Sequence, residues 1–217
     1  MKIGSGVGRG TSVTPAARFH KEDRTLPLPE RFFERRPEVV APELLGKLIV
    51  GDRVAVRIVE VEAYGGADDP ASHAFRRQTP RNEAMFGPPG RWYVYFTYGM
   101  HWCMNVVCGP RGEPGAVLFR AGEPLRGLEE MWKRRPAARR ETDLCSGPAK
   151  LCQAIGVDGS LSGLPTQAIA GSVVSIADDG TPPPITPGVS TRVGISAGQS
   201  SPWRWWVPGS QHVSRRQ

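Results

Sequence analysis

Hydrophobic and polar residues alternate along several short stretches of the chain, and this period of two predicts β-strands. Strands are expected over residues 47–50, 54–64, 116–120 and 172–176. A further run over residues 93–108 predicts a β-hairpin that bends at Tyr98 and Gly99. Glycine and proline are abundant (26 and 21 residues), which favours many turns and short strands over a helical bundle.

A helical period appears in only a few places. A short helix is expected around residues 42–45 and closed by Gly46, and a longer one over residues 125–135. A third helix is expected to have Ser146 as its N-cap, Pro148 in its first turn and Gly156 at its end. Its free N–H groups could hold a phosphate, although a helix capped only by Ser146 and water is as good an interpretation of this feature alone.

The strand expected over residues 54–64 changes phase. Apolar side chains occupy even positions up to Ile58 and odd positions from Val59 onward, which predicts a bulge or a change of packing face near Ile58. Beyond that point one face, opposite the apolar one, carries Glu60, Glu62 and Tyr64.

The chain has 217 residues, a net charge of +7 and a pI near 9.6, which favours polyanionic partners. No stretch of about 18 apolar residues exists, so no membrane span is expected. The first residues lack the apolar core of a signal peptide, so a cytoplasmic protein is expected. Residues 1–26 are interpreted as a flexible basic tail.

Four cysteines stand at positions 103, 108, 145 and 152, and their spacing fits no common zinc pattern. Cys152 falls in an apolar helical pattern and is expected to be a small buried hydrophobe; no metal and no cofactor are expected. The chain contains no Walker loop, no dinucleotide fingerprint and no Ser/His/Asp motif.

An aromatic side chain at the hairpin bend points to nucleic acid. Tyr98 cannot easily be buried within its own hairpin, and an exposed ring on a rigid hairpin of a basic protein suggests a wedge that enters a base stack. Taken alone, the feature also fits a tyrosine that folds onto a neighbouring segment.

Many short motifs occur in the order found in one family: 61–64 (VEAY), His73, 77–82 (RQTPRN), 85–86 (MF), 93–95 (YVY), 98–100 (YGM), 103–105 (CMN), 118–121 (LFRA), 123–125 (EPL) and 144–148 (LCSGP). From about Leu28 to Gly209 the chain resembles the alkyladenine (3-methyladenine) DNA glycosylases of the mammalian AAG type, which also occur in bacteria. The resemblance implies an α+β fold: a single compact domain over residues 27–217 with a curved antiparallel sheet, a few flanking helices and a protruding β-hairpin.

The resemblance also implies roles for individual residues. The catalytic residues would be Glu62, which activates a water, and Arg120, which orients Glu62 and neutralises phosphate. The pocket for the flipped base would be formed by Tyr64, Ala71, His73, Tyr95, Cys103 and Asn105, with Asn105 excluding the 2-amino group of normal guanine. Tyr98 and Met100 would intercalate, and the DNA backbone would contact Arg77, Arg81, Ser146 and Lys150.

The activity implied is excision of damaged purines from double-stranded DNA, namely 3-methyladenine, 7-methylguanine, hypoxanthine and ethenoadenine. The enzyme would flip the nucleotide, hydrolyse the N-glycosidic bond and leave an abasic site, without lyase activity. It would work as a monomer in the bacterial nucleoid. Two departures make lesion preference harder to predict: a short loop between His73 and Arg77, and a segment over 194–198 that lacks a histidine common in the family.

Three other functions remain open on the residues. The chain could be a non-catalytic protein that binds damaged DNA through the same wedge. It could be a hydrolase that acts on RNA or on free nucleotides with the same stacking pocket. It could also be a metal-dependent hydrolase, which sensitivity to a chelator would reveal.

Overall fold

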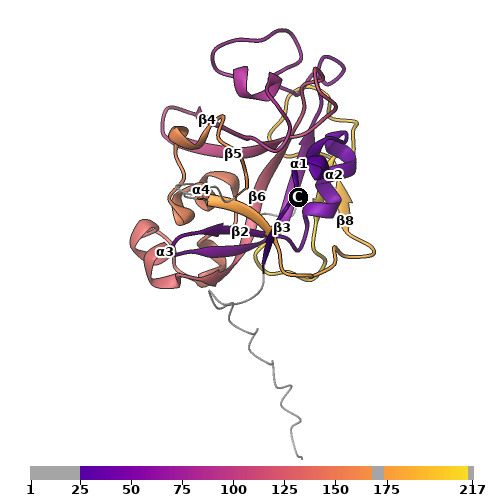
Figure 1. Ribbon diagram of the computed structural model, residues 1–217. Helices are drawn as coiled ribbons and strands as arrows, with labels where there is room; N and C mark the ends of the chain where they lie inside the picture. Colours follow the sequence, from indigo (N-terminus) through magenta and orange to yellow (C-terminus); the bar gives the residue numbers. More distant parts are fainter. Residues whose placement is uncertain (1–24, 168–173, 215–217) are drawn as a thin grey trace, which may run out of the picture.

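One antiparallel sheet organises the molecule. The computed structural model describes residues 25–167 and 174–214, and within these ranges nine strands form a sheet in the order β1-β7-β2-β3-β6-β5-β4, with β9 on β3 and β8 on β9 (Figure 1). The strands are β1 (Leu26–Pro27), β2 (Leu48–Gly51), β3 (Ala55–Tyr64), β4 (Trp92–Thr97), β5 (His101–Val107), β6 (Ala116–Arg126), β7 (Val174–Asp178), β8 (Gly188–Ser190) and β9 (Arg204–Trp206).

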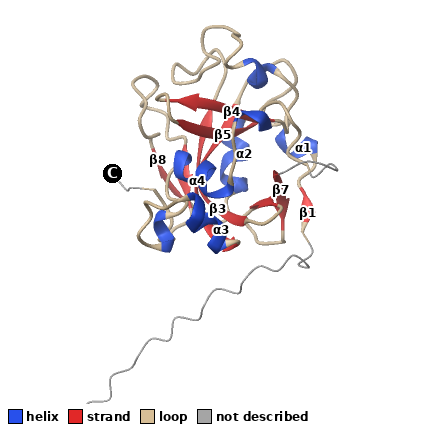
Figure 2. Ribbon diagram, turned by 90° about the vertical axis from the view of Figure 1, so that its left-hand side faces the viewer, coloured by secondary structure: helices blue, strands red, loops and turns tan. Residues whose placement is uncertain are grey.

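Short helices flank this sheet. The α-helices are α1 (Glu30–Phe33), α2 (Pro37–Leu44), α3 (Leu128–Arg134) and α4 (Pro148–Ile155), and three 3-10 turns are η1 (Glu83–Phe86), η2 (Glu141–Asp143) and η3 (Gly159–Leu161). Figures 1 and 2 show α3 and α4 on a different flank of the sheet from α1 and α2. The fold is a single domain of the α+β class with a curled antiparallel sheet, as expected. No described helix combines the length and apolar character that a membrane crossing requires.

The phase change predicted in β3 is confirmed as a bulge. The register between β3 and β6 shifts between Ile58 and Glu60, and again between Glu60 and Val61. Core side chains are Val56 and Ile58 before the bulge and Val61 and Ala63 after it. The bulge therefore turns the second half of β3 so that its acidic residues face the side of the sheet opposite the main core.

The hairpin is also confirmed, with β4 and β5 paired from Trp92↔Val106 to Thr97↔His101. Tyr98 and Gly99 at its bend have φ values of 51° and 66°. Tyr98 is the one non-glycine residue with positive φ in the described ranges.

Several predicted boundaries were wrong. The helix expected at 42–45 is α2, which begins at Pro37 because a proline suits the first turn, and it contains Pro42. The strand expected to end at Arg120 continues to Arg126 because β3 offers pairing partners along its whole length. The helix expected over 125–135 therefore begins only at Leu128, after Gly127 with φ of 78°.

Ser146 does not cap the helix that follows it. Gly147 occupies the N-cap of α4, and no side-chain hydrogen bond caps the helix. Ser146 instead forms an isolated β-bridge with Ala121 of β6. The backbone of Ser146 thus pairs with β6, and the residue does not take up the N-cap position of α4.

The ends of two predicted segments lie outside the described residues. The expected tail covers residues 1–26, of which 1–24 are not described, whereas Leu26 already pairs with Asp178 in the sheet. The strand expected at 172–176 is β7, and its first two predicted residues are likewise not described.

Candidate active site

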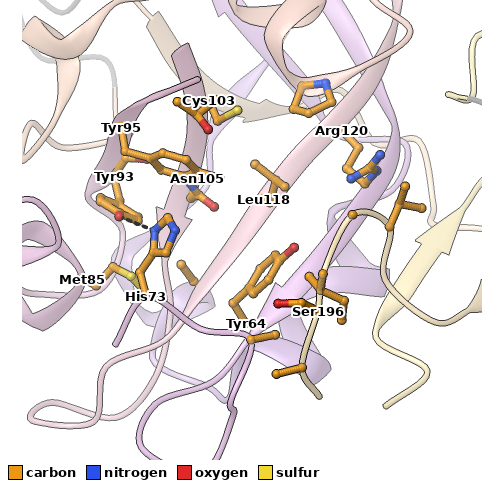
Figure 3. Close-up of a pocket in the computed structure, with 18 of the residues that line it drawn as sticks. Tyr64, His73, Met85, Tyr93, Tyr95, Cys103, Asn105, Leu118, Arg120 and Ser196 are labelled. Carbon is orange, nitrogen blue, oxygen red and sulfur yellow. Dashed lines mark hydrogen bonds between the residues drawn. The ribbon is translucent and has the colours of Figure 1, made fainter. Parts of the chain in front are cut away.

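A cavity of about 350 Å³ opens where the ends of β3, β4, β5 and β6 meet the loop over residues 193–197 (Figure 3). Its lining includes all six residues expected to form the base pocket: Tyr64, Ala71, His73, Tyr95, Cys103 and Asn105. The other lining residues are Arg120, which is expected to be catalytic, and Pro70, Met85, Tyr93, Thr97, Tyr98, Ala116, Leu118, Pro148 and residues 193–197. The fold therefore brings side chains from distant parts of the chain to one place.

Aromatic rings form two opposite walls of this cavity. Tyr64 lies on one side, and His73, Tyr93 and Tyr95 lie on the other (Figure 3). The ring centroids of His73 and Tyr95 are 4.6 Å apart in an edge-to-face arrangement. The space between the walls suits a flat aromatic ligand, since such rings gain from stacking on both faces.

His73 is fixed in this wall by its neighbours. Its Nδ1 lies 2.7 Å from the Tyr93 hydroxyl, and its backbone oxygen accepts a hydrogen bond from the Asn82 amide. Partial burial of the imidazole, and to a smaller degree the Arg81 guanidinium, lower the pKa of His73. A neutral imidazole is therefore favoured at neutral pH, which avoids repulsion of a cationic ligand.

Asn105 and Cys103 lie on β5 and line the cavity. Asn105 is 3% exposed, and its amide nitrogen donates to the Tyr93 backbone oxygen at 3.0 Å. Cys103 pairs with Tyr95 across the hairpin, and burial raises the pKa of its thiol. The Asn105 amide is thus held in one orientation toward anything that enters.

Glu62 lies next to the cavity with its carboxylate fully buried. Its Oε2 accepts hydrogen bonds from the Tyr64 hydroxyl at 2.8 Å and from Arg120 Nη1 at 3.1 Å. Its Oε1 accepts one from the Val193 backbone N–H at 2.7 Å. Three residues that line the cavity thus hold the Glu62 carboxylate next to it.

Two buried groups near this site were missed by the sequence reasoning. Glu60, to which no role was assigned, contacts Arg120, Arg204 and Ser214. The only signal in the sequence was that it shares a face with Glu62; its basic partner in β9 is 144 residues away.

The other missed group is the pair of Asp69 and Arg192. Their contacts measure 2.6 and 2.8 Å, and both side chains are almost completely buried. Asp69 also accepts from the backbone N–H of Ala71, whereas Arg192 donates to the backbone oxygen of Gly198 and lies 4.8 Å from the Tyr64 ring centroid. This pair therefore ties together the two loops that form the cavity rim.

The hairpin bend lies at the mouth of the cavity. Tyr98 is 86% exposed and Met100 is 68% exposed, although both are large and apolar. Tyr98 also contributes to the cavity lining. An exposed ring in a left-handed backbone conformation does not stabilise the fold, so this feature indicates that Tyr98 contacts a binding partner.

The expected contacts to the DNA backbone are spread around this mouth. Arg77 and Arg81 are exposed and line a neighbouring cavity of about 360 Å³, and Arg81 donates to the Phe96 backbone oxygen. Lys150 is exposed on α4, whose first residue Pro148 lines the base cavity. Ser146 is half-buried just before that helix.

All four cysteines are free and buried, and this includes Cys152, for which burial was expected. Over residues 25–167 and 174–214, no three His, Cys, Asp or Glu side chains come together in a way that would hold a metal ion.

Comparisons with known proteins agree with this geometry. Residues 31–211 match the family model of methylpurine-DNA glycosylase. A protein of Burkholderia cenocepacia (strain HI2424) is 54% identical over 188 residues, which covers 86% of this chain and 90% of that protein. Proteins of Frankia casuarinae and Streptomyces avermitilis are 48% and 47% identical, covering 84% and 88% of this chain and 90% and 92% of their own lengths. All three carry the provisional name 3-methyladenine DNA glycosylase. The chain belongs to the methylpurine-DNA glycosylase family and is a DNA glycosylase.

Proposed function

We propose that this glycosylase removes 3-methyladenine and other alkylated or deaminated purines from double-stranded DNA by a water that Glu62 activates. The observation that carries the proposal is the contact between the aromatic cavity and the Glu62–Arg120 pair, with Tyr98 exposed at the cavity mouth. The names of the relatives refer to 3-methyladenine; 7-methylguanine, hypoxanthine and ethenoadenine are further flat purine lesions that the resemblance implies.

The first step would be extrusion of the damaged nucleotide. A base inside a duplex is out of reach, and unstacking it costs a few kcal/mol. Tyr98 would enter the gap that the nucleotide leaves, with Met100 beside it, and the base would slide between Tyr64 and the rings of His73 and Tyr95. The cationic lesions 3-methyladenine and 7-methylguanine gain additional attraction from the electron-rich faces of these rings.

The second step would break the N-glycosidic bond. Glu62 would accept a proton from a water while the water oxygen bonds to C1′ of the sugar. The electron pair of the C1′–N bond leaves with the purine. The negative charge of Glu62 also stabilises the positive charge that grows on the sugar, and Arg120 holds the carboxylate and neutralises phosphate.

The products would be a free base and an abasic site. A lyase step would need an amine next to C1′. No lysine is among the described residues that line the cavity, and Lys150 is exposed on α4. We therefore propose a monofunctional enzyme. A monomer that works in the cytoplasm on the bacterial nucleoid stays our prediction for assembly and location.

The test is single-turnover release of the base from a duplex that contains one hypoxanthine or one 7-methylguanine, for the native protein and for Glu62→Gln. We expect a loss of about 10²- to 10⁴-fold in the variant, the range for a general base, with DNA binding retained. The glutamine amide must face either the Val193 N–H or Arg120, so thermal unfolding is measured as well. Asp179→Asn is the matched control, since Asp179 is an arginine-paired carboxylate outside the cavity lining.

Each outcome has a distinct meaning. Tight binding to damaged DNA without excision by the native protein would indicate a non-catalytic binding protein. Excision that survives Glu62→Gln would keep the reaction but overturn the mechanism. Cleavage of the product strand by β-elimination without added base would contradict the monofunctional assignment.

A further inference from the structure

Glu60 lies at the centre of a buried cluster of charges beside the proposed catalytic pair. Its carboxylate is fully buried. Oε1 accepts from Arg120 Nε at 2.9 Å, from Arg204 Nε at 2.7 Å and from Ser214 Oγ at 2.8 Å. Oε2 accepts from the Ser214 backbone N–H at 2.6 Å. These contacts fix the carboxylate from three sides.

The same contacts fix Arg120. Nε of its guanidinium donates to Glu60, Nη1 to Glu62 and Nη2 to Ser214 Oγ at 3.4 Å. The side chain is only 9% exposed, and what remains open lines the base cavity. A planar guanidinium held at three nitrogens cannot rotate, so the edge that meets Glu62 is set by its partners on the other edge.

Charge balance explains why a second carboxylate is present. Arg120 and Arg204 are both buried, and a buried charge requires an opposite partner. Burial alone would raise the pKa of Glu60, but the two guanidinium groups and Ser214 hold it below its usual range. The cluster thus contains two arginines and two carboxylates, with Glu60 between the arginines and Glu62 at the cavity.

We propose that Glu60 is a positioning residue of this glycosylase: held by Arg204 and by Ser214, it sets Arg120 against Glu62. Arg204 lies on β9 and Ser214 close to the end of the chain, so the C-terminal segment completes the active site. The inference rests on the proposed roles of Glu62 and Arg120. Glu60 would act through Arg120 and would not itself touch the reacting atoms.

The experiment compares native protein, Glu60→Gln and Ser214→Ala in single-turnover excision of hypoxanthine from a duplex, over pH 5 to 9, with DNA affinity measured separately. Ser175→Ala is the matched control, because Ser175 is a buried serine on β7 whose hydroxyl donates to the Val50 backbone oxygen.

We expect Glu60→Gln to lower the excision rate constant about 10- to 100-fold with DNA affinity within about threefold, because small misplacements of a catalytic group have effects of this size. The pH profile of excision should also change, because Glu60→Gln removes one of the two negative charges that contact Arg120. Ser214→Ala should lie between Glu60→Gln and native protein, and Ser175→Ala should match native protein.

A Glu60→Gln protein that loses thermal stability but keeps the native rate constant and pH profile would overturn the inference, since Glu60 would then serve folding alone. If Glu60→Gln does not fold, a native rate constant for Ser214→Ala overturns it instead. Absence of excision by the native protein would overturn the proposed function, whereas native excision together with an unaffected Glu60→Gln would overturn this inference alone.

Discussion

Replacement of Tyr98 by asparagine should make the folded protein more stable and the enzyme slower. Tyr98 has a φ of 51° and is 86% exposed, so it gains little from packing while its backbone is strained. The left-handed conformation costs an ordinary residue about 1–2 kcal/mol, and asparagine tolerates it better. Relief of about half of that strain would add about 0.5–1 kcal/mol of stability, which raises Tm by about 1–4 °C in a chain of this length.

The effect on excision has the opposite sign. The Tyr98 ring is proposed to stack in the gap that the flipped nucleotide leaves, and such stacking contributes about 1–3 kcal/mol per base. Since 1.36 kcal/mol corresponds to a factor of ten, loss of the ring should slow excision from a duplex about 5- to 150-fold. Excision from a single-stranded oligonucleotide should change much less, because no neighbouring stack needs to be refilled.

The assay pairs thermal unfolding with single-turnover excision from duplex and single-stranded substrates. Gly99→Ala is the control: its φ is 66° and an added Cβ meets no atom within 4 Å, so the variant adds strain and keeps the ring. It should lose about 1 kcal/mol of stability and retain duplex excision. A lower Tm for Tyr98→Asn, or duplex excision within twofold of native protein, would refute the reasoning.

Three further predictions concern the cavity. Asn105→Ala should allow release of undamaged guanine from duplex DNA, because the amide proposed to meet the 2-amino group is gone; chromatography of released bases measures this, and no rise in guanine would contradict the role. Burial and Arg81 lower the pKa of His73, so the folded protein binds fewer protons than the unfolded chain below the ordinary value of 6.5. The free energy of unfolding should therefore fall as pH drops below 6.5, and His73→Gln should reduce that slope in urea titrations. Asp69→Asn should cost about 3–5 kcal/mol, since it leaves Arg192 buried without its charge partner; an unfolding midpoint in urea near that of native protein would disprove the estimate.

Local patterns located the hairpin but not the length of the strand beside it. Alternation and the Tyr98–Gly99 pair are properties of neighbours in the chain, so the sequence was sufficient to predict them. The continuation of β6 past Arg120 is different, because glycine and proline at 122 and 124 ordinarily interrupt strands. Gly122 instead allows close approach to β3, where an added Cβ would lie 3.1 Å from Val56 Cβ. The length of β6 therefore depends on its pairing with β3, which is distant in the sequence.

In the candidate site, too, some residues could be predicted from the sequence and others depend on contacts between distant parts of the chain. The resemblance in sequence marked Glu62, Tyr64, His73 and Tyr95 before any geometry was known, and the structure places all four in or beside one cavity. Asp69 and Arg192 were not marked, because they are 123 residues apart and meet only after folding. Each residue alone would be interpreted as an ordinary surface charge.

The bulge in β3 connects fold and function most directly. A strand with one continuous period of two would put Val56 and Ile58 in the core together with Glu60 and Glu62, and two buried carboxylates there would have no partners. The shift of register between Ile58 and Glu60 keeps Val61 and Ala63 in the core instead. Glu60 then contacts Arg120 and Arg204, and Glu62 contacts Arg120 beside the cavity, both from a strand near the middle of the sheet. The break in pattern that weakens a prediction of secondary structure is thus the feature that makes an active site possible on this strand.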